Sequence, residues 1–155
     1  MDDYKKAINK LGWTQKEMDR MKNFGEVIND NSPFVYRAKS KIHGQGMFAQ
    51  VNIKKDSFLG LASVAPVYKT FLGRYTNHSF NANIKFTFDK DSHVCVVAIK
   101  NIKKDEEILV DYTDHIPSKN SKEIIQQLQQ LADKSSEERK EKIYKLIRKL
   151  KNGQQ

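Results

Sequence analysis

Cysteine is almost missing from this sequence, and long apolar runs are missing altogether. Cys95 is the single cysteine among 155 residues, which excludes an intrachain disulfide and a zinc cluster built from several cysteines. No run of 18 or more apolar residues occurs, so we expect no membrane-spanning helix. The first ten residues contain no apolar stretch of the kind found in secretory signals. These absences favour a protein of an intracellular, reducing compartment, either cytoplasm or nucleus.

The net charge of +9 is unevenly distributed along the chain. Residues 1–35 carry six basic and six acidic side chains, whereas residues 119–155 carry ten basic and five acidic ones. The surplus is mainly Lys, which suits a solvated surface better than bidentate recognition of bases or phosphates. A basic chain can bind nucleic acid through its phosphates, or it can bind an acidic protein, and charge alone does not choose between them.

The N-terminal segment, residues 1–33, predicts two short helices. Thr14 and Glu17 have the spacing of a capping box at the start of the second helix. An apolar stripe follows at helical spacing, formed by Trp13, Met18, Met21 and Phe24. We expect this segment to pack on the main domain without chemistry of its own.

The central part, residues 34–118, alternates short apolar and polar stretches and therefore predicts strands. The sequence Asn-Ile-Lys-Lys-Asp occurs twice, at 52–56 and at 101–105, each time between two apolar stretches. Because Asp tolerates left-handed backbone geometry, each copy is predicted to close a three-residue hairpin. The pattern indicates an α+β domain that is mostly β, with flanking helices.

The C-terminal part, residues 119–155, predicts two amphipathic helices. Asn120 with Glu123 and Ser135 with Glu138 have the spacing of helix caps. The apolar stripes are too short for a free coiled coil. We therefore expect this part either to pack on the domain or to form a homodimer contact.

A polar stretch, residues 74–83, lies between the two copies of the repeated turn. It contains many side chains that form directed hydrogen bonds, namely Arg74, Asn77, His78, Ser79, Asn81 and Asn83. A surface loop explains such a composition, because Asn and Ser are common in turns. Two further stretches, at 43–49 and 98–112, give it a different interpretation.

Together the three stretches resemble the motifs of the SET domain, the fold of S-adenosylmethionine-dependent protein-lysine methyltransferases. Residues 39–49 resemble the N-terminal motif, in which a Gly-x-Gly turn precedes a strand, and residues 74–79, RYTNHS, resemble the Asn-His-Ser motif. Residues 98–112 resemble the closing motif, which ends in Asp-Tyr. The resemblance covers about 34–116 and implies a β-clip fold of short curled sheets, with a knot-like C-terminal crossing near Tyr112. The cysteine-rich flanks of many members are absent.

The resemblance also implies a site. Tyr112 would be the catalytic residue, with its hydroxyl near the methyl group and the attacking lysine nitrogen. The cofactor S-adenosyl-L-methionine would be bound by Gly44, Gln45, Gly46, Met47, Arg74, Asn77 and His78. The substrate channel would be lined by Leu61, Phe86 and Tyr112. A protein lysine side chain would be the substrate, and no metal is implied.

Individual roles follow from the same resemblance. Gly44 and Gly46 would allow the backbone to approach the cofactor closely, because no Cβ intrudes. Asn77 would bind the methionine end of the cofactor and Arg74 its carboxylate. His78 would recognise the adenine through main-chain groups.

The sequence also departs from the family pattern. Leu61 stands where many members carry a tyrosine, and Ala82 replaces a usual proline. Phe86 falls where a Tyr or Phe choice governs how many methyl groups are added, and a Phe there implies di- or trimethylation. Residues 117–151 would have to close the lysine channel, with Tyr144 or His115 as its aromatic wall.

Two other interpretations stay open. A catalytically degenerate SET-like protein would bind a protein, or nucleic acid, through its basic C-terminal helix. A metal site would use His93 and Cys95 with His115 or His43, but the sequence lacks a second close pair of ligands. The identity of a protein substrate, and the choice between monomer and homodimer, are not fixed by the sequence.

Overall fold

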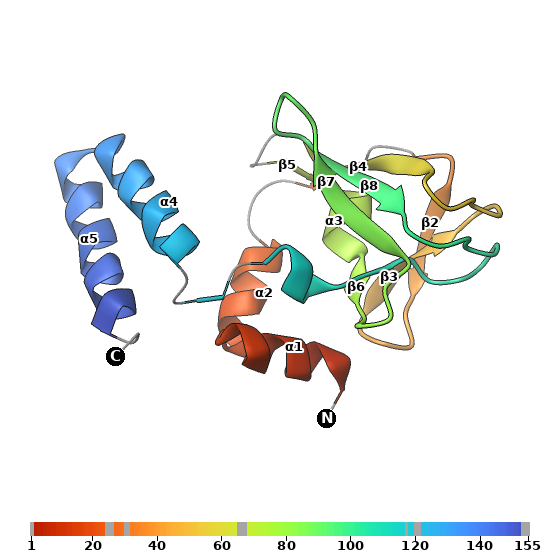
Figure 1. The fold of residues 1–155 in the computed structure, drawn as a ribbon, viewed down its shortest axis with the longest axis horizontal. Coiled ribbons are helices and arrows are strands. Elements are labelled where there is room, and N and C mark those ends of the chain that lie inside the picture. The colour runs from red at the N-terminus through yellow and green to blue at the C-terminus, as the bar shows by residue number, and fades with distance from the viewer. Residues whose placement is uncertain are drawn as a thin grey trace.

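The computed structural model describes residues 2–23, 27–29, 32–64, 68–116, 118–119 and 122–152. The helices are α1 (Asp3–Leu11), α2 (Gln15–Asn23), α3 (Phe71–Tyr75), α4 (Lys122–Asp133) and α5 (Glu137–Asn152), with a 3-10 turn η1 (Tyr112–Asp114). The strands are β1 (Val27–Ile28), β2 (Val35–Lys39), β3 (Gln45–Ala49), β4 (Phe58–Val64), β5 (Tyr68–Thr70), β6 (Asn77–His78), β7 (Ile84–Phe88), β8 (Val94–Ala98) and β9 (Leu109–Val110). This mixture of short strands and flanking helices confirms the α+β class (Figure 1).

The strands form two sheets of very different size. Seven strands follow the order β1-β5-β4-β8-β7-β9-β6, and β2 pairs with β3 alone. The pairing of β4 with β8 shifts register twice, between Phe58 and Gly60 and between Leu61 and Ser63. Such irregularities bend a strand and increase its twist. The result is the set of short curled sheets that the resemblance implied (Figure 1).

The two copies of the repeated turn have the backbone geometry that the sequence predicts. Asp56 has a φ of 72° and Asp105 a φ of 70°, both in the left-handed region. The prediction that each copy closes a hairpin is wrong, however. The strands on either side of each turn do not pair with each other. Around the first turn β3 pairs with β2, and β4 pairs with β5 and β8; around the second, β8 pairs with β4 and β7, and β9 with β6 and β7.

The two turns pair with each other instead. Ile53 and Ile102 exchange two backbone hydrogen bonds of 2.8 Å. The side chain of Asn52 accepts from the backbone N–H of Lys104 at 2.9 Å. In the same way Asn101 accepts from the N–H of the other copy's second lysine, Lys55, at 2.9 Å. Each Asn thus satisfies the backbone of the other copy, which explains why the same five residues occur twice.

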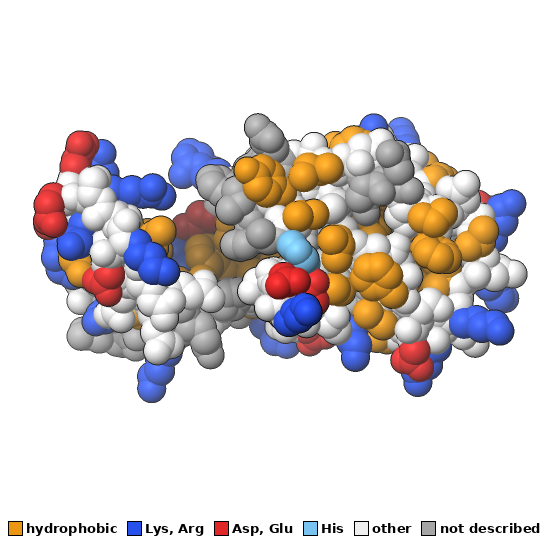
Figure 2. Space-filling model, turned by 90° about the horizontal axis from the view of Figure 1, so that it is seen from above, with side chains coloured by type: hydrophobic (Ala, Val, Ile, Leu, Met, Phe, Trp, Pro, Cys, Tyr) orange, Lys and Arg blue, Asp and Glu red, His pale blue; other side chains and the backbone are white. Residues whose placement is uncertain are grey.

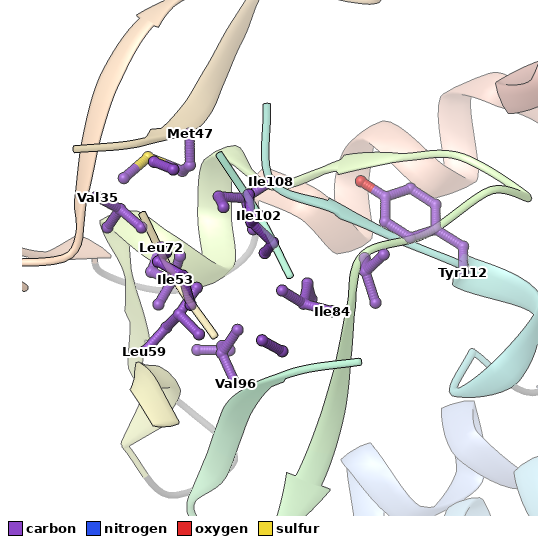
Figure 3. Packing of buried hydrophobic residues seen from close by; sticks show 14 of the residues in the cluster. Val35, Met47, Ile53, Leu59, Leu72, Ile84, Val96, Ile102, Ile108 and Tyr112 are labelled. Carbon is purple, nitrogen blue, oxygen red and sulfur yellow. The ribbon is translucent and has the colours of Figure 1, made fainter. Parts of the chain in front are cut away.

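One hydrophobic core connects the sheets and the N-terminal helices. Its most deeply buried members include Met18, Leu59, Leu72, Ile84, Val96, Ile102, Ile108 and Val110. Figure 3 shows Tyr112 at one end of this cluster. The capping box of α2 is present, because Glu17 N–H donates to Thr14 Oγ1 at 3.2 Å and Thr14 N–H donates to Glu17 Oε2 at 2.8 Å. It directs α2 so that Met18 enters the core with no exposed surface.

Helices α4 and α5 have a hydrophobic core of their own. Ile125 and Ala132 of α4 pack against Ile143 and Ile147 of α5. Figure 1 shows this pair away from the sheets, and Figure 2 shows many charged side chains over it, while hydrophobic side chains gather over the sheets. None of the described helices is both long and apolar enough to cross a membrane. The predicted stripe residue Phe24 and the predicted cap Asn120 lie outside the described residues.

Candidate active site

The polar stretch and the closing motif lie side by side at the centre of the fold. Strand β6 runs parallel to β9, with Asn77 opposite Leu109 and His78 opposite Val110. Asn83 adds two side-chain bonds, donating from Nδ2 to the backbone oxygen of Glu107 and accepting at Oδ1 from Leu109 N–H, both at 2.8 Å. In a stretch with the composition of a surface loop, Thr76, Asn77, His78 and Asn83 are therefore buried, because side chains replace the backbone partners that short strands leave unmatched.

Tyr112 is fixed at this crossing from both ends. Its backbone N–H donates to Nδ1 of His78 at 2.9 Å, and its hydroxyl donates to the backbone oxygen of Thr76 at 2.9 Å. The side chain is 6% exposed. Burial raises the pKa of the Tyr112 hydroxyl well above its usual range. The phenol therefore keeps its proton at any physiological pH.

His78 is a buried support for Tyr112. Since Nδ1 accepts a hydrogen bond from Tyr112, the neutral ring carries its proton on Nε2. Burial lowers the pKa of His78, although Asp111, 3.8 Å from Nδ1, acts in the opposite direction. Among the described side chains, Nε2 is the buried polar atom without a hydrogen-bond partner.

A polar cleft of about 310 Å³ opens beside the Gly-Gln-Gly turn. It is lined by Asp19, Lys22, Asn23, His43, Gly44, Gln45, Arg74, Tyr75 and Asn77. Four of the residues expected to bind the cofactor are in this set: Gly44, Gln45, Arg74 and Asn77. The other three, Gly46, Met47 and His78, do not line it.

Asn77 holds the turn that forms one wall of the polar cleft. Its amide nitrogen donates to the backbone oxygens of His43 at 3.0 Å and Gln45 at 3.1 Å, and to Oε1 of Glu107 at 3.0 Å. The same Glu107 oxygen accepts from the Ser40 hydroxyl at 2.7 Å. The donor group of Asn77 is thus already used within the protein, and Glu107 is a central residue that lies in the closing motif but was given no role there.

The two glycines of the turn have different reasons to be glycine. A Cβ on Gly46 would lie 2.3 Å from Oε1 of Glu107, so this residue is required by the Glu107 carboxylate and not by a ligand. Gly44 has a φ of +48° and no atom within 4 Å of the position of a Cβ. Only Gly44 therefore leaves open space of the kind that close approach of a ligand needs.

An apolar cavity of about 390 Å³ lies on the other side of Lys22 and Arg74. It is lined by Met18, Met21, Lys22, Ala62, Ser63, Lys69, Gly73, Arg74, Phe86, Phe88, Val94, Tyr112, His115 and Ile116. Of the three residues expected to line a substrate channel, Phe86 and Tyr112 are in this set. Leu61 is not, because β4 contributes the two residues that follow it in the sequence, next to a register shift of the strand.

His115 supplies the aromatic wall of the apolar cavity. Its ring lies 4.5 Å from that of Phe86 and 5.9 Å from that of Tyr112. Burial lowers the pKa of His115 to about 4, so the ring is neutral near pH 7. Tyr144, the other candidate, donates its hydroxyl to Asp133 of the neighbouring helix at 3.4 Å and is not among the residues lining the cavity.

Helix α2 lines both spaces, which the sequence reasoning missed. Met18, Met21 and Lys22 follow one face of this helix, and Lys22 and Arg74 are the lining residues that the cleft and the cavity share. Nζ of Lys22 lies 5.1 Å from the ring centre of Tyr4 and 5.8 Å from that of Tyr112. The i, i+3, i+4 spacing was visible in the sequence, but it was interpreted as packing alone.

For the alternative metal site, the structure groups His93 with two acidic residues. His93 lies near Asp89 and Asp91, with potential ligand atoms within 4.8 Å of one another. Oδ1 of Asp89 accepts from the N–H groups of both Asp91 and His93, which is the arrangement of a closed turn between β7 and β8. Cys95 lies within β8, opposite Leu61 and Thr87.

Two solved structures illustrate what the chain is similar to. A candidate histone methyltransferase of Plasmodium falciparum is 25% identical, with a TM-score of 0.43 over 50% of this chain and 91% of its own. A humanised mutant of the Chaetomium thermophilum Polycomb Repressive Complex 2, bound to an inhibitor, is 23% identical with a TM-score of 0.46. That similarity covers 54% of this chain but 15% of the other. No curated protein matches the chain.

The family comparison gives the more specific result. Residues 61–113 match the family model of the SET domain. The matched region contains the Asn-His-Ser stretch, strands β6 to β9 and Tyr112, which are the elements that form the central crossing. Over these residues, about a third of the chain, the protein is therefore similar to the SET domain.

Proposed function

We propose that this chain is an S-adenosyl-L-methionine-dependent protein-lysine N-methyltransferase. The observation that carries the proposal is the meeting of two unlike spaces beside Tyr112. The polar cleft and the apolar cavity share Lys22 and Arg74 as walls. A polar cleft suits a donor with an amino acid and a nucleoside part, and a narrow apolar cavity suits the methylene chain of a lysine. The SET-domain match supports the same assignment of a donor site and a lysine channel.

The residues of the polar cleft fit the donor in part. Gly44 offers open space, and Arg74 lines the cleft, where its guanidinium, which donates to Oδ1 of Asn23, can also pair with a carboxylate. Asn77 contributes through its carbonyl oxygen, because its amide nitrogen is bonded to the turn. When bound, S-adenosylmethionine supplies an electrophilic methyl group on a sulfonium centre.

The apolar cavity favours the reactive form of the substrate amine. A lysine amine has an ordinary pKa of about 10.4, so deprotonation at pH 7 costs about 4.6 kcal/mol. Phe86, Val94 and the neutral His115 remove water from the amine. The cationic Lys22, Lys69 and Arg74 line the same cavity and disfavour a further positive charge there. Desolvation disfavours the charged form, which recovers part of this cost.

Tyr112 acts by orientation in this proposal. Its hydroxyl keeps its proton and is directed by the Thr76 oxygen, so it cannot serve as a general base at neutral pH. Its position is fixed by His78 and Thr76, and a fixed phenol holds the two reactants in line. The proton of the amine leaves to water.

The test is transfer from a labelled donor to proteins of a cell extract, followed by mass spectrometry of modified lysines. The expected result is label on lysine Nζ atoms, with donor binding measured separately by calorimetry. Absence of both donor binding and transfer would overturn the proposal.

A second candidate function rests on the separate core of α4 and α5. This pair packs on itself through Ile125, Ala132, Ile143 and Ile147 and carries basic residues in its last turn. A binding module would retain nucleic acid in a salt-sensitive way without binding the donor. Donor binding together with lysine labelling would exclude it as the main activity.

A further inference from the structure

Lys22 places an amine of this chain at the junction of the two spaces. It is the next-to-last residue of α2, and its side chain is half-buried. Nζ lies over the rings of both Tyr4 and Tyr112 and lines the cleft as well as the cavity. This is the place where the proposed function requires a substrate amine.

A second lysine of the apolar cavity, Lys69, shows by contrast what a purely structural amine looks like. Its Nζ donates to the backbone oxygens of Met21 at 2.5 Å and Lys22 at 3.2 Å. It thus satisfies the last carbonyl groups of α2, as basic side chains at helix ends commonly do. Lys69 thereby fixes the end of α2 that carries Lys22.

The ammonium group of Lys22 has no such commitment. No hydrogen bond or ion pair to its Nζ is found within the part of the chain that the structure describes; its neighbours there are the faces of the two rings. Burial lowers the pKa of Lys22, and the positive charge of Arg74 acts in the same direction, while Asp19 opposes it. A sulfonium in the polar cleft would add a further positive charge and favour the neutral amine again.

We propose that Lys22 is a methyl acceptor that the enzyme modifies within its own molecule, an inference that rests on the proposed function. The lone pair of neutral Nζ forms a bond to the methyl carbon of the donor. The sulfur–methyl bond breaks with its electron pair remaining on sulfur, so that the sulfonium becomes a neutral thioether. The methylated ammonium then releases a proton to water when a further methyl group is to be added.

The first experiment maps label on the purified full chain. The wild type is incubated with isotopically labelled S-adenosylmethionine alone, and its peptides are analysed by mass spectrometry. The expected result is label on Lys22 at a first-order rate that does not change with protein concentration. Lys22→Arg should lose this label, while Lys16→Arg, an exposed lysine of the same helix, should keep it.

The second experiment separates transfer within one molecule from transfer between molecules. Tyr112→Phe, which keeps Lys22 but should transfer methyl groups on the order of 100-fold more slowly, is mixed with Lys22→Arg, which keeps Tyr112. The activity of Lys22→Arg is first verified on extract proteins. The expected result is label on Lys22 of the Tyr112→Phe chain no faster than that chain produces alone. Label there at the wild-type rate would overturn modification within the molecule.

A third readout does not depend on turnover. Lys22→Met removes a positive charge beside the place of the sulfonium, so it should bind S-adenosylmethionine on the order of fivefold more tightly than the wild type. The neutral thioether product should bind the two proteins about equally. Equal donor binding by both proteins would contradict the placement of Lys22 next to the sulfonium.

The outcomes distinguish this inference from the function on which it rests. Label on extract lysines with unlabelled Lys22 would overturn the inference alone. The same result with faster transfer by Lys22→Met would make Lys22 an obstruction of the channel and not an acceptor. Absence of donor binding and of all transfer would overturn both proposals.

Discussion

The polar cleft and the apolar cavity are built in different ways from the same chain. The cleft is formed largely by motif residues, and its geometry depends on specific bonds such as those from Asn77 to the Gly-Gln-Gly turn. The cavity takes much of its lining from α2 and from the residues after Tyr112, which belong to no motif. A hydrogen bond needs a particular atom at a particular place, whereas an apolar wall needs only volume. Sequence motifs therefore record the first kind of site much better than the second.

The largest effect is expected where the two spaces meet. Tyr112→Phe should reduce methyl transfer on the order of 100-fold, comparable to the loss of one well-placed polar group in other enzymes. Donor binding should remain, because the polar cleft does not include Tyr112. Unfolding should become easier by only about 1 kcal/mol, since the Thr76 oxygen loses one hydrogen bond. Transfer rates and calorimetric binding test this directly, and a rate within threefold of wild type would remove Tyr112 from the mechanism.

The next prediction concerns the polar cleft alone. Gly46→Ala places a Cβ against the Glu107 carboxylate and should lower the free energy of unfolding by about 1–3 kcal/mol, with weaker donor binding. Gly44→Ala meets no atom and should cost about 1 kcal/mol through its left-handed backbone. Denaturant unfolding and calorimetry compare the two variants. Equal effects of both would show that the Glu107 contact does not set the shape of the turn.

A third change tests the apolar cavity. Phe86→Tyr adds a hydroxyl to a ring 4.5 Å from that of His115 and takes room from the substrate amine. The yield of the most highly methylated product should fall on the order of tenfold relative to the monomethylated one. Phe58→Tyr is the matched control, because that side chain is 53% exposed and does not line the apolar cavity. Mass spectrometry of the product distribution distinguishes them, and the same distribution in both variants would contradict the placement of Phe86.

Much of the fold was predictable because local rules act on a few neighbouring residues. The capping box of Thr14 and Glu17 and the left-handed Asp56 and Asp105 appear as the sequence indicated. The pairing of the two repeated turns was not predictable from local rules. It depends on Asn52 reaching a backbone group 52 residues further along the chain. The sequence shows that two copies exist, but not that each completes the other.

The candidate site was predictable to a similar degree. Asn77 lines the polar cleft, but its amide nitrogen bonds to the protein where a ligand contact was expected. Leu61 was expected in the channel because it stands where many family members carry a tyrosine, but the strand shifts register next to it and the two residues that follow it line the cavity instead. Glu107 and Lys22 were given no role because a partner of each is distant in sequence: Asn77 is 30 residues from Glu107, and Tyr112 is 90 residues from Lys22.

The smallest expected effect is the pH dependence contributed by His115 of the apolar cavity. Its folded pKa of about 4 lies below the ordinary value of 6.5, so between these values the unfolded chain binds a proton that the folded chain does not. This contribution to stability is complete above pH 6.5 and is lost as the pH falls towards 4.

His115→Gln should therefore gain stability relative to the wild type when the pH is lowered from 7.5 to 4.5. The expected gain is on the order of 1 kcal/mol, because the ring is only partly shielded from solvent. His78 has a lowered pKa as well, but it is present in both proteins, so the difference between their urea midpoints at the two pH values isolates His115. The same difference between the two midpoints at both pH values would mean that water reaches the ring. A hydrated wall could not favour a neutral lysine in the apolar cavity as proposed.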